Sequence, residues 1–382
     1  MLTHLCLVSS QPTPNLTPVL DNDIAPRRVI LLVSHSMTKQ ADWLKAVLEK
    51  RGVRVERWKL PDAYDVEQIQ HHVLELLERE QALIEEKAIM LNATGGTKPM
   101  SIAAYEAFRA YELPIFYVHP ETDRLIWLYP QGRAAIDLAN RIRIEPFLEA
   151  HGVLVDGEPG RNIPDPALLE TGKEIVARIK QFTEPLSQLN WLAATAARSS
   201  LLSERVRDDK GWLAELLDLF ARNGFLKREN GRLRFANENA RFFANGGWLE
   251  YLVFDAIRTQ RRQDDAIQDI VRSIRVQRQR KGEFVPNEID VAFLRDNRLH
   301  IIECKTRKFV GKDEDGPGAE ALYKLDSLSD LMGGLQARAM LVSFREIAPH
   351  DRARANDMGI AVCSGQELQM LQRHIKNFMA GE

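Results

Sequence analysis

The segment NEIDVAFLRDNRLHIIECKT, residues 287–306, decides the fold of the C-terminal part of this chain. Two runs of apolar and β-branched residues flank Asp296 and Asn297, which tolerate the positive φ of a two-residue turn. Arg295 then faces Arg298, and in an antiparallel ladder all directly opposed pairs have residue numbers with the same sum. The segment therefore predicts a β-hairpin of fixed register.

The residue numbers of Asp290 and Glu303 have the same sum as those of Arg295 and Arg298, so these two acids are predicted to be directly opposed. We expect Asp290 and Glu303 on one face with β-carbons about 5 Å apart, and Lys305 shares that face. The other face, which we expect to be the core side, carries Ile289, Val291, Phe293, Ile302 and Cys304. Opposed like charges are destabilising unless a positive charge lies between them, and a divalent cation with oxygen ligands fits there. The hairpin predicts a metal site, although Lys305 alone could neutralise one acid.

A further acid lies in the helical pattern WLEYLVFDAI. The helical neighbours of Glu250 are Val253, Phe254 and Ile257, so a carboxylate faces an apolar stripe. An acid in a first turn also suits the helix dipole. Residues 270–312 carry 11 Lys and Arg against 5 Asp and Glu in a chain whose net charge is −2. This local positive charge would attract phosphate to the rim of the carboxylates.

The first 130 or so residues alternate apolar segments with amphipathic helical patterns, which predicts a Rossmann-like α/β domain with a parallel sheet. The expected strands are residues 4–10, 28–35, 53–60, 88–94 and 114–120. Residues 156–166 are rich in Gly, Pro and Asp, as a linker is. Helical patterns and a hairpin turn at Asn230 and Gly231 then predict a winged-helix-like module, which could bind DNA or act as a packing or dimerising spacer.

The chain thus divides into an N-terminal domain, a linker, a middle module and a C-terminal mixed α/β domain, over residues 1–145, 146–185, 186–245 and 246–382. Three scattered cysteines predict no disulfide framework and favour a reducing compartment. No apolar stretch approaches the roughly 18 residues of a membrane-spanning helix. We expect a cytoplasmic protein without a membrane partner.

Two loops follow expected strands of the N-terminal domain. SSQPTPNLTP spans residues 9–18, and NATGGTKPM spans residues 92–100 and lacks the GxxxxGK[ST] spacing of a Walker A loop. A helix that begins near Pro99 would offer free N–H groups to an anion, although a plain tight turn is the alternative. Because both loops leave the carboxyl ends of parallel strands, we expect them to outline one ligand pocket.

The hairpin motif resembles the PD-(D/E)xK motif of restriction-endonuclease-like nucleases, because Asp290 is followed after twelve residues by Glu303, Cys304 and Lys305. Glu250 matches the first-helix acid of that family. The resemblance implies phosphodiester cleavage with Mg²⁺ or Mn²⁺ held by these three acids and the backbone carbonyl of Cys304, and it makes Lys305 the residue that orients water or steadies developing charge.

The motif has Glu288 and Ile289 before Asp290, where the family often has proline. Glu288 is therefore an alternative metal ligand, although strict alternation places it opposite Lys305 and away from Glu303. The side chain of Cys304 is predicted to point to the other face as a buried apolar group.

The two loops resemble those of the CARF family, the CRISPR-associated Rossmann-fold sensors, and the whole domain order is similar to CARF nucleases of type III CRISPR systems. This resemblance implies a homodimer that binds a cyclic oligoadenylate, most often cyclic tetra-adenylate. Lys98 is the residue expected to meet phosphate. The ligand role falls on Ser10, Gln11, Thr13, Asn15, Thr94, Gly95, Gly96, Thr97 and Lys98.

We therefore predict a cyclic oligoadenylate-activated, metal-dependent nuclease that cleaves single-stranded RNA or DNA, and possibly duplex DNA, in antiviral defence. Two alternatives have different requirements. A ligand-controlled winged-helix transcription regulator would not need the carboxylates and Lys305, and a constitutive DNA-repair nuclease would not need the paired loops.

Overall fold

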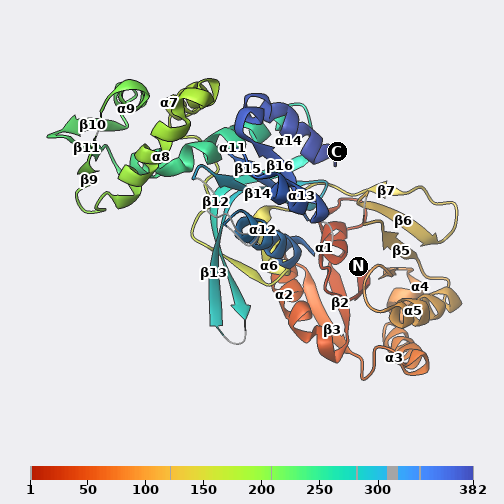
Figure 1. Ribbon diagram of the computed structural model, residues 1–382. Helices are drawn as coiled ribbons and strands as arrows, with labels where there is room; N and C mark the ends of the chain where they lie inside the picture. The colour runs from red at the N-terminus through yellow and green to blue at the C-terminus, as the bar shows by residue number, and fades with distance from the viewer. Residues whose placement is uncertain are drawn as a thin grey trace.

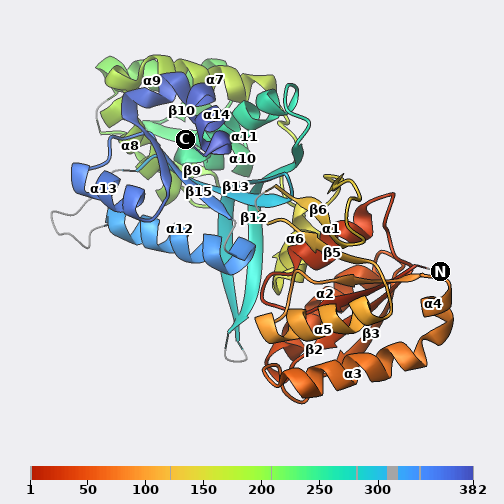
Figure 2. The ribbon, with the colours of Figure 1, turned by 90° about the vertical axis from the view of Figure 1, so that its right-hand side faces the viewer.

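The computed structural model describes residues 2–120, 122–207, 209–280, 283–307, 317–334 and 337–381. The N-terminal domain and the middle module lie at opposite ends of the molecule, with the C-terminal sheet between them (Figures 1 and 2). No described helix is long and apolar enough to cross a membrane.

The N-terminal domain contains a seven-stranded sheet of order β3-β2-β1-β4-β5-β6-β7. Its first five strands are parallel and confirm the expected Rossmann-like sheet. They are β1 (Thr3–Leu7), β2 (Arg28–Val33), β3 (Arg54–Lys59), β4 (Ile89–Asn92) and β5 (Ile115–Val118). The antiparallel strands β6 (Arg124–Tyr129) and β7 (Ile136–Asp137) extend this sheet beyond the strands that the sequence predicts.

Helices cover both faces of this sheet, so its central strands β1, β2 and β4 are buried almost throughout. One face packs on α3 (Val66–Arg79) and α5 (Lys98–Ala110). The other face packs on α2 (Thr38–Glu49) and α6 (Ile144–Ala150), and this cluster continues into the C-terminal sheet. The short helices α1 (Thr13–Leu20) and α4 (Gln81–Glu85) complete the domain. The N-terminal and C-terminal domains therefore share a continuous hydrophobic core.

The middle module consists of helices and a small sheet of order β10-β11-β9, and its helix α7 and the start of α8 lie in the segment that was predicted to be the linker. Asn230 and Gly231 form the expected hairpin turn with φ of 51° and 74°. The elements are α7 (Pro166–Ala177), α8 (Ile179–Thr195), β9 (Leu202–Arg205), α9 (Gly211–Arg222), β10 (Leu226–Glu229), β11 (Arg232–Phe235) and α10 (Glu238–Phe242).

The segment that we expected to be a linker is largely ordered secondary structure. Its strand β8 (Val153–Asp156) pairs antiparallel with β12 and so becomes the edge of the C-terminal sheet. The Gly- and Pro-rich stretch that suggested a linker forms only the connection between β8 and α7, and there Gly160 forms an isolated bridge with Arg272.

The C-terminal sheet has the order β16-β15-β14-β13-β12-β8. The strands β12, β13 and β14 are antiparallel neighbours, whereas β14, β15 and β16 run parallel. The elements are α11 (Trp248–Arg261), β12 (Ile267–Arg280), β13 (Glu283–Arg295), β14 (Arg298–Lys305), α12 (Pro317–Gly333), β15 (Arg338–Ser343), α13 (Pro349–Asp357), β16 (Ala361–Ser364) and α14 (Leu371–Ala380).

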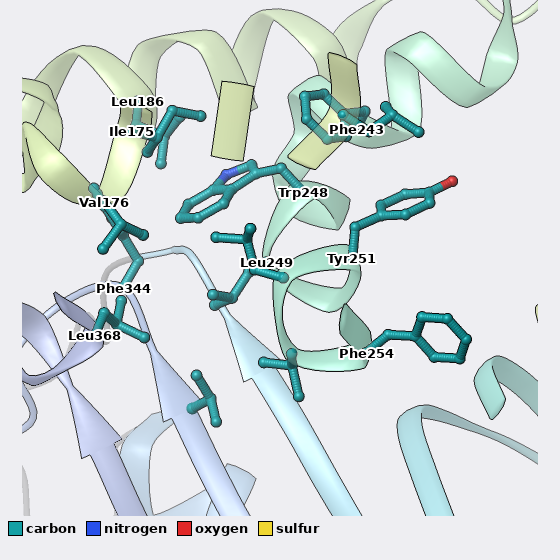
Figure 3. Close-up of a cluster of buried hydrophobic side chains, with 14 of the residues drawn as sticks. Ile175, Val176, Leu186, Phe243, Trp248, Leu249, Tyr251, Phe254, Phe344 and Leu368 are labelled. Carbon is teal, nitrogen blue, oxygen red and sulfur yellow. The ribbon is translucent and has the colours of Figure 1, made fainter. Parts of the chain in front are cut away.

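The middle module and the C-terminal domain also share one core. Side chains of α7 and α8, including Val176 and Leu186, pack with Trp248 of α11 and with Phe344 after β15 (Figure 3). Burial of each such side chain contributes about 1.5–3 kcal/mol. This packing fixes the module against the end of the sheet where β14 and β15 terminate.

Candidate active site and ligand loops

The β13–β14 hairpin has the register that the sequence predicts. The pairs run from Val291 with Ile302 to Arg295 with Arg298. Asp296 and its neighbour in the turn have φ of 48° and 54°, so both adopt the left-handed conformation that was expected.

The prediction of a single core face of this hairpin is wrong, because both faces are covered. Val291, Phe293 and Ile302 pack on the α11 side, with Cys304 against them. Ile289 instead packs on the opposite side, in the cluster that contains α12 residues. The regular alternation of side chains is thus broken between residues 289 and 291.

The break coincides with a distortion of the neighbouring strand. In the β12–β13 ladder, Arg272 pairs with Val291 and Ile274 pairs with Ile289. Ser273, between these two pairs, has φ of 48°, a conformation that β-strand residues rarely adopt. Asp290 therefore occupies an irregular point of the sheet and not a regular cross-strand position.

Asp290 lies at the end of the hairpin ladder, where its Oδ2 accepts a hydrogen bond from the backbone N–H of Cys304 (2.6 Å). The pKa of Asp290 is raised to about 7, chiefly by burial and also by the nearby charge of Glu303, while the hydrogen bond from Cys304 opposes the shift. A positive charge placed near this carboxyl group would therefore stabilise its ionised form.

Glu303 is 2% exposed and its Oε1 has two lysine partners. Lys305 forms an ion pair with it, and Lys324 of α12 lies 3.5 Å away. Burial alone would lower the pKa of Lys305, but the Glu303 carboxylate outweighs this effect and raises it. Lys305 is consequently a stable cation at this site.

Glu250 is 9% exposed on α11, and its Oε2 accepts a hydrogen bond from the Ser273 hydroxyl (2.8 Å). Burial raises the pKa of Glu250 well above its usual value, and the charge of Asp290 raises it further. Glu288 raises the pKa values of both Glu250 and Asp290. The sequence-predicted acids are therefore brought together around Asp290, and Glu288 belongs to the same acidic surroundings.

These residues fit a divalent cation in donor chemistry and charge. Hard cations bind carboxylate and carbonyl oxygens. Burial first, and neighbouring negative charge second, raise the pKa values of Asp290 and Glu250, and a bound cation would oppose both effects. Within the described residues, however, no group of three or more His, Cys, Asp or Glu side chains is already arranged to hold a metal ion. Glu303 would have to exchange lysine contacts for metal contacts.

Two residues of this site were missed by sequence reasoning. Lys324 lies on a helix among core-facing leucines, and Ser273 lies within a strand-like run, so neither has a local signal. Burial and the neighbouring acids raise the pKa of the Cys304 thiol well above its usual value, which fits the expected buried apolar role. Lys281, Lys308 and Lys312 of the basic segment lie outside the described residues.

The two ligand loops are joined by buried asparagines at the carboxyl ends of β1 and β4. Asn92 donates to the Asn15 side-chain oxygen (2.9 Å), and Asn15 donates to the Leu7 carbonyl (2.9 Å). Asn15 is only 1% exposed. Asn15 therefore holds the two loops together, and its expected contact with the ligand stays a prediction.

The glycines of the second loop have a packing function. A β-carbon on Gly95 would lie 2.0 Å from the Leu7 carbonyl oxygen, and one on Gly96, which has φ of 72°, would press on the Leu7 and Met100 side chains. Thr94 accepts a hydrogen bond from the Val118 N–H (2.8 Å). The loop therefore packs closely on β1, and this packing alone accounts for the glycines.

The polar groups open to solvent at these loops are fewer than we expected. Lys98 is exposed at the first turn of α5, after Thr97, whose hydroxyl caps this helix at the Met100 N–H (3.3 Å). Ser10 is exposed and Gln11 is half-buried. Thr13, also half-buried, begins α1.

The first loop also borders the C-terminal domain. A cavity of about 420 Å³ lies between Ser10, Gln11 and Trp43 of the N-terminal domain and Leu331 at the end of α12. A β-carbon on Gly334 would lie 2.3 Å from the Gln11 side-chain oxygen, so the two segments are in contact. The same helix carries Lys324 to the acidic site.

Comparison with known proteins identifies the two large domains. Residues 3–147 match the family model described as the Card1 CARF domain, and residues 237–381 match the Card1-like endonuclease domain. The crystal structure of protein VC1899 from Vibrio cholerae is 35% identical, with a TM-score of 0.91, and the match covers 100% of this chain and 98% of that chain. This chain belongs to the Card1-like CARF nucleases.

Two further solved structures resemble this Card1-like protein. Can2 from Sulfobacillus thermosulfidooxidans, solved in complex with cyclic tetra-adenylate, is 28% identical with a TM-score of 0.81, and the match covers 99% of each chain. A type III CRISPR defence DNA nuclease activated by cyclic oligoadenylate is 23% identical, with a TM-score of 0.59 over 91% of this chain and 46% of that chain, and shares the fold. No curated protein is significantly similar.

Proposed function

We propose that this Card1-like protein is a metal-dependent endonuclease that cyclic tetra-adenylate activates to cleave RNA or DNA in CRISPR antiviral defence. The observation that carries the proposal is the cluster of buried acids around Asp290, with Lys305 beside Glu303, on the central strands β13 and β14 of the endonuclease sheet. The similarity to Can2, whose structure contains cyclic tetra-adenylate, supports the choice of activator.

The chemistry divides among the residues of the site. Asp290, Glu303, Glu250 and the backbone carbonyl of Cys304 would hold Mg²⁺ or Mn²⁺, which when bound activates water and polarises the scissile phosphate. Lys305 would orient the attacking water or stabilise the charge that develops on the phosphate. The Cys304 N–H already fixes the orientation of the Asp290 carboxylate.

The sensor domain would act through a symmetric dimer in the cytoplasm. Lys98 would meet a phosphate of the cyclic ligand, and its exposure at the N-terminal end of α5 supports this role. The ligand activates only if it binds the cleavage-competent arrangement of the dimer more tightly than the inactive one. Contact between Gln11 and the end of α12 gives one route from the ligand loop to Lys324 and Glu303.

The decisive experiment measures cleavage of labelled single-stranded RNA, single-stranded DNA and plasmid with Mn²⁺, with and without cyclic tetra-adenylate. We expect cleavage only when both are present. Cleavage that is independent of the ligand would favour a constitutive repair nuclease. Sequence-specific DNA binding without cleavage would favour a transcription regulator and refute the proposal.

A further inference from the structure

The middle module contains a cavity that the nuclease function described so far does not use. It has a volume of about 540 Å³ and lies between α8 and the end of β9. Its walls are formed by Ser187, Gln188 and Trp191 on one side and by Arg205, Val206 and Arg207 on the other. We call this site the α8–β9 groove.

Trp191 is the largest side chain of the groove, and 51% of its surface is exposed. The neighbouring α8 residues Leu189 and Asn190 are only 0% and 2% exposed, so the other side of the helix faces the core. An indole ring left half open beside a cavity presents a planar apolar face to solvent. Such a face is the platform on which unpaired nucleic-acid bases stack.

The groove also carries positive charge that is free to meet an anion. Arg205 and Arg207 are exposed, and neither side chain has an ion-pair partner in the described part of the chain. By contrast, Arg228 and Arg234 of the same module form ion pairs with acids of that module. The guanidinium groups of the groove can therefore bind phosphates without first breaking a salt bridge.

The acid of the groove does not cancel this charge. Glu184 lines the same cavity, but its carboxylate is paired with Arg345 at 2.7 Å. Arg345 also donates to the Thr183 carbonyl (2.8 Å), which fastens α8 to the segment after β15. Among the described residues, the groove thus presents an exposed aromatic ring and two arginine side chains that have no ion-pair partner.

The groove lies close to the candidate active site. Asn190, next to Trp191, is hydrogen-bonded to the Thr306 hydroxyl (3.0 Å), and Thr306 directly follows Lys305. The Lys305 carbonyl in turn accepts a hydrogen bond from the Phe344 N–H (2.7 Å). Trp191 is thus one residue away from a direct contact with the end of the strand that carries Lys305.

We propose that the α8–β9 groove binds the single-stranded nucleic-acid substrate beside the cleavage site, with an unpaired base stacked on Trp191 and phosphates held by Arg205 and Arg207. The assignment rests on the proposed nuclease function and deepens it. Duplex bases are stacked on one another and cannot offer a free face, so the groove selects single strands. The winged-helix-like module is then a substrate-binding element of the enzyme.

The test measures binding of a labelled single-stranded oligonucleotide to the full-length Asp290→Ala protein with EDTA, by fluorescence anisotropy. Trp191→Ala should weaken binding by roughly 5- to 100-fold, because a stacked base contributes about 1–3 kcal/mol. Trp191→Phe should recover part of the affinity. The double variant Arg205→Ala/Arg207→Ala should flatten the slope of log K against log salt by about 1.4.

Two variants of the same module serve as controls. Trp212→Ala removes another exposed tryptophan, 47% exposed on α9, and Lys227→Ala removes an exposed charge of β10. Neither residue lines the groove, so both variants should bind as the parent protein does. Unchanged thermal unfolding of all variants shows that they are folded.

The possible outcomes distinguish a failure of the groove proposal from a failure of the nuclease proposal. If the unmutated protein cleaves single strands but the groove variants keep the affinity and salt slope of the parent protein, only the groove proposal is refuted. A duplex that competes as well as the single strand would also overturn it. An unmutated protein that neither binds nor cleaves single strands with Mn²⁺ and cyclic tetra-adenylate would refute both proposals.

Discussion

Asn297, in the turn between β13 and β14, donates a hydrogen bond from Nδ2 to the Asp123 carboxylate of the CARF domain (2.5 Å). The same amide group contacts the Asn140 side-chain oxygen (3.2 Å), and Gln268 binds both the amide oxygen and the backbone N–H of Asn297. Because Asn297 is only 2% exposed, these bonds are shielded from water. The strands that carry Asp290 and Glu303 are thus anchored to the sensor domain at their turn.

Replacement of this amide should weaken the connection between sensor and nuclease. Asn297→Ala leaves the buried Asp123 carboxylate without its donor, which should lower the free energy of unfolding by about 1–3 kcal/mol. We expect the variant to bind cyclic tetra-adenylate normally and to show a smaller stimulation of cleavage. Ligand titration and cleavage rates with and without ligand measure the two effects separately.

The matched control for this variant is Asn230→Ala. Asn230 has nearly the same positive φ, 51° against 54°, in a hairpin turn of the middle module. Alanine costs similar backbone strain at both positions, but only Asn297 touches Asp123. Equal stimulation of the two variants by the ligand would contradict the expected role of Asn297.

The Asp123 carboxyl group should give the protein a pH-dependent stability. The pKa of Asp123 is raised to about 7, chiefly by burial and also by the charges of Asp296 and Asp137, against the hydrogen bond from Asn297. Between about pH 4 and about pH 7 the folded protein holds a proton that the unfolded chain has released, so stability falls as the pH rises through this window, by at most about 1.4 kcal/mol per pH unit.

The comparison that isolates this group is wild type against Asp123→Asn. From about pH 5 to about pH 8, the urea midpoint of the wild type should decrease more than that of the variant. Asp23→Asn, an exposed acid of the same domain, should behave as the wild type does. A parallel decrease of wild type and Asp123→Asn would show that another group dominates.

Substitution of any one of three residues of the acidic site should cause a large loss of cleavage. Asp290→Ala, Glu303→Ala and Lys305→Ala should each reduce the cleavage rate at least about 100-fold, because each would remove a proposed metal ligand or the cation proposed to lie beside the reacting phosphate. Binding of cyclic tetra-adenylate should be unaffected. Glu283→Ala, an exposed acid at the start of β13, is the control. Full activity of any one of the three variants would undo the assignment.

Lys98→Ala should affect the sensor and spare the nuclease site. Loss of a charge-assisted contact to phosphate is worth about 1.5–3 kcal/mol, which corresponds to a roughly 10- to 100-fold weaker affinity for cyclic tetra-adenylate. Binding of Mn²⁺ should not change. Lys39→Ala, an exposed lysine of α2, is the control. Unchanged ligand affinity would remove Lys98 from the pocket.

The hairpin shows which parts of the site can be predicted from sequence. Its register follows from Asp296 and Asn297, because a two-residue turn and a period of two residues are both local properties. The orientation of Asp290 is not local. It depends on the left-handed conformation of Ser273 in the adjacent strand, and no pattern within the hairpin reports that distortion.

Burial explains the other differences. Asn15 follows a strand end in a loop that the motif assigns to ligand binding, yet pairing with Asn92 turns it inward. Lys324 reaches Glu303 only because α12 packs across β14, a contact between distant parts of the chain. Sequence patterns predict strands, helices and turns, whereas the partners of a buried polar group are decided by tertiary packing.

Strand β8 is the outermost strand of the endonuclease sheet, although it comes from a segment that precedes the whole middle module in the chain. The endonuclease family match begins only at residue 237. A fragment cut at that point would leave the backbone of β12 without its neighbour, and such a bare strand recruits other chains into intermolecular sheets. Excision of the catalytic half at residue 237 is thus expected to yield aggregates, and a fragment intended for study has to include Val153–Asp156.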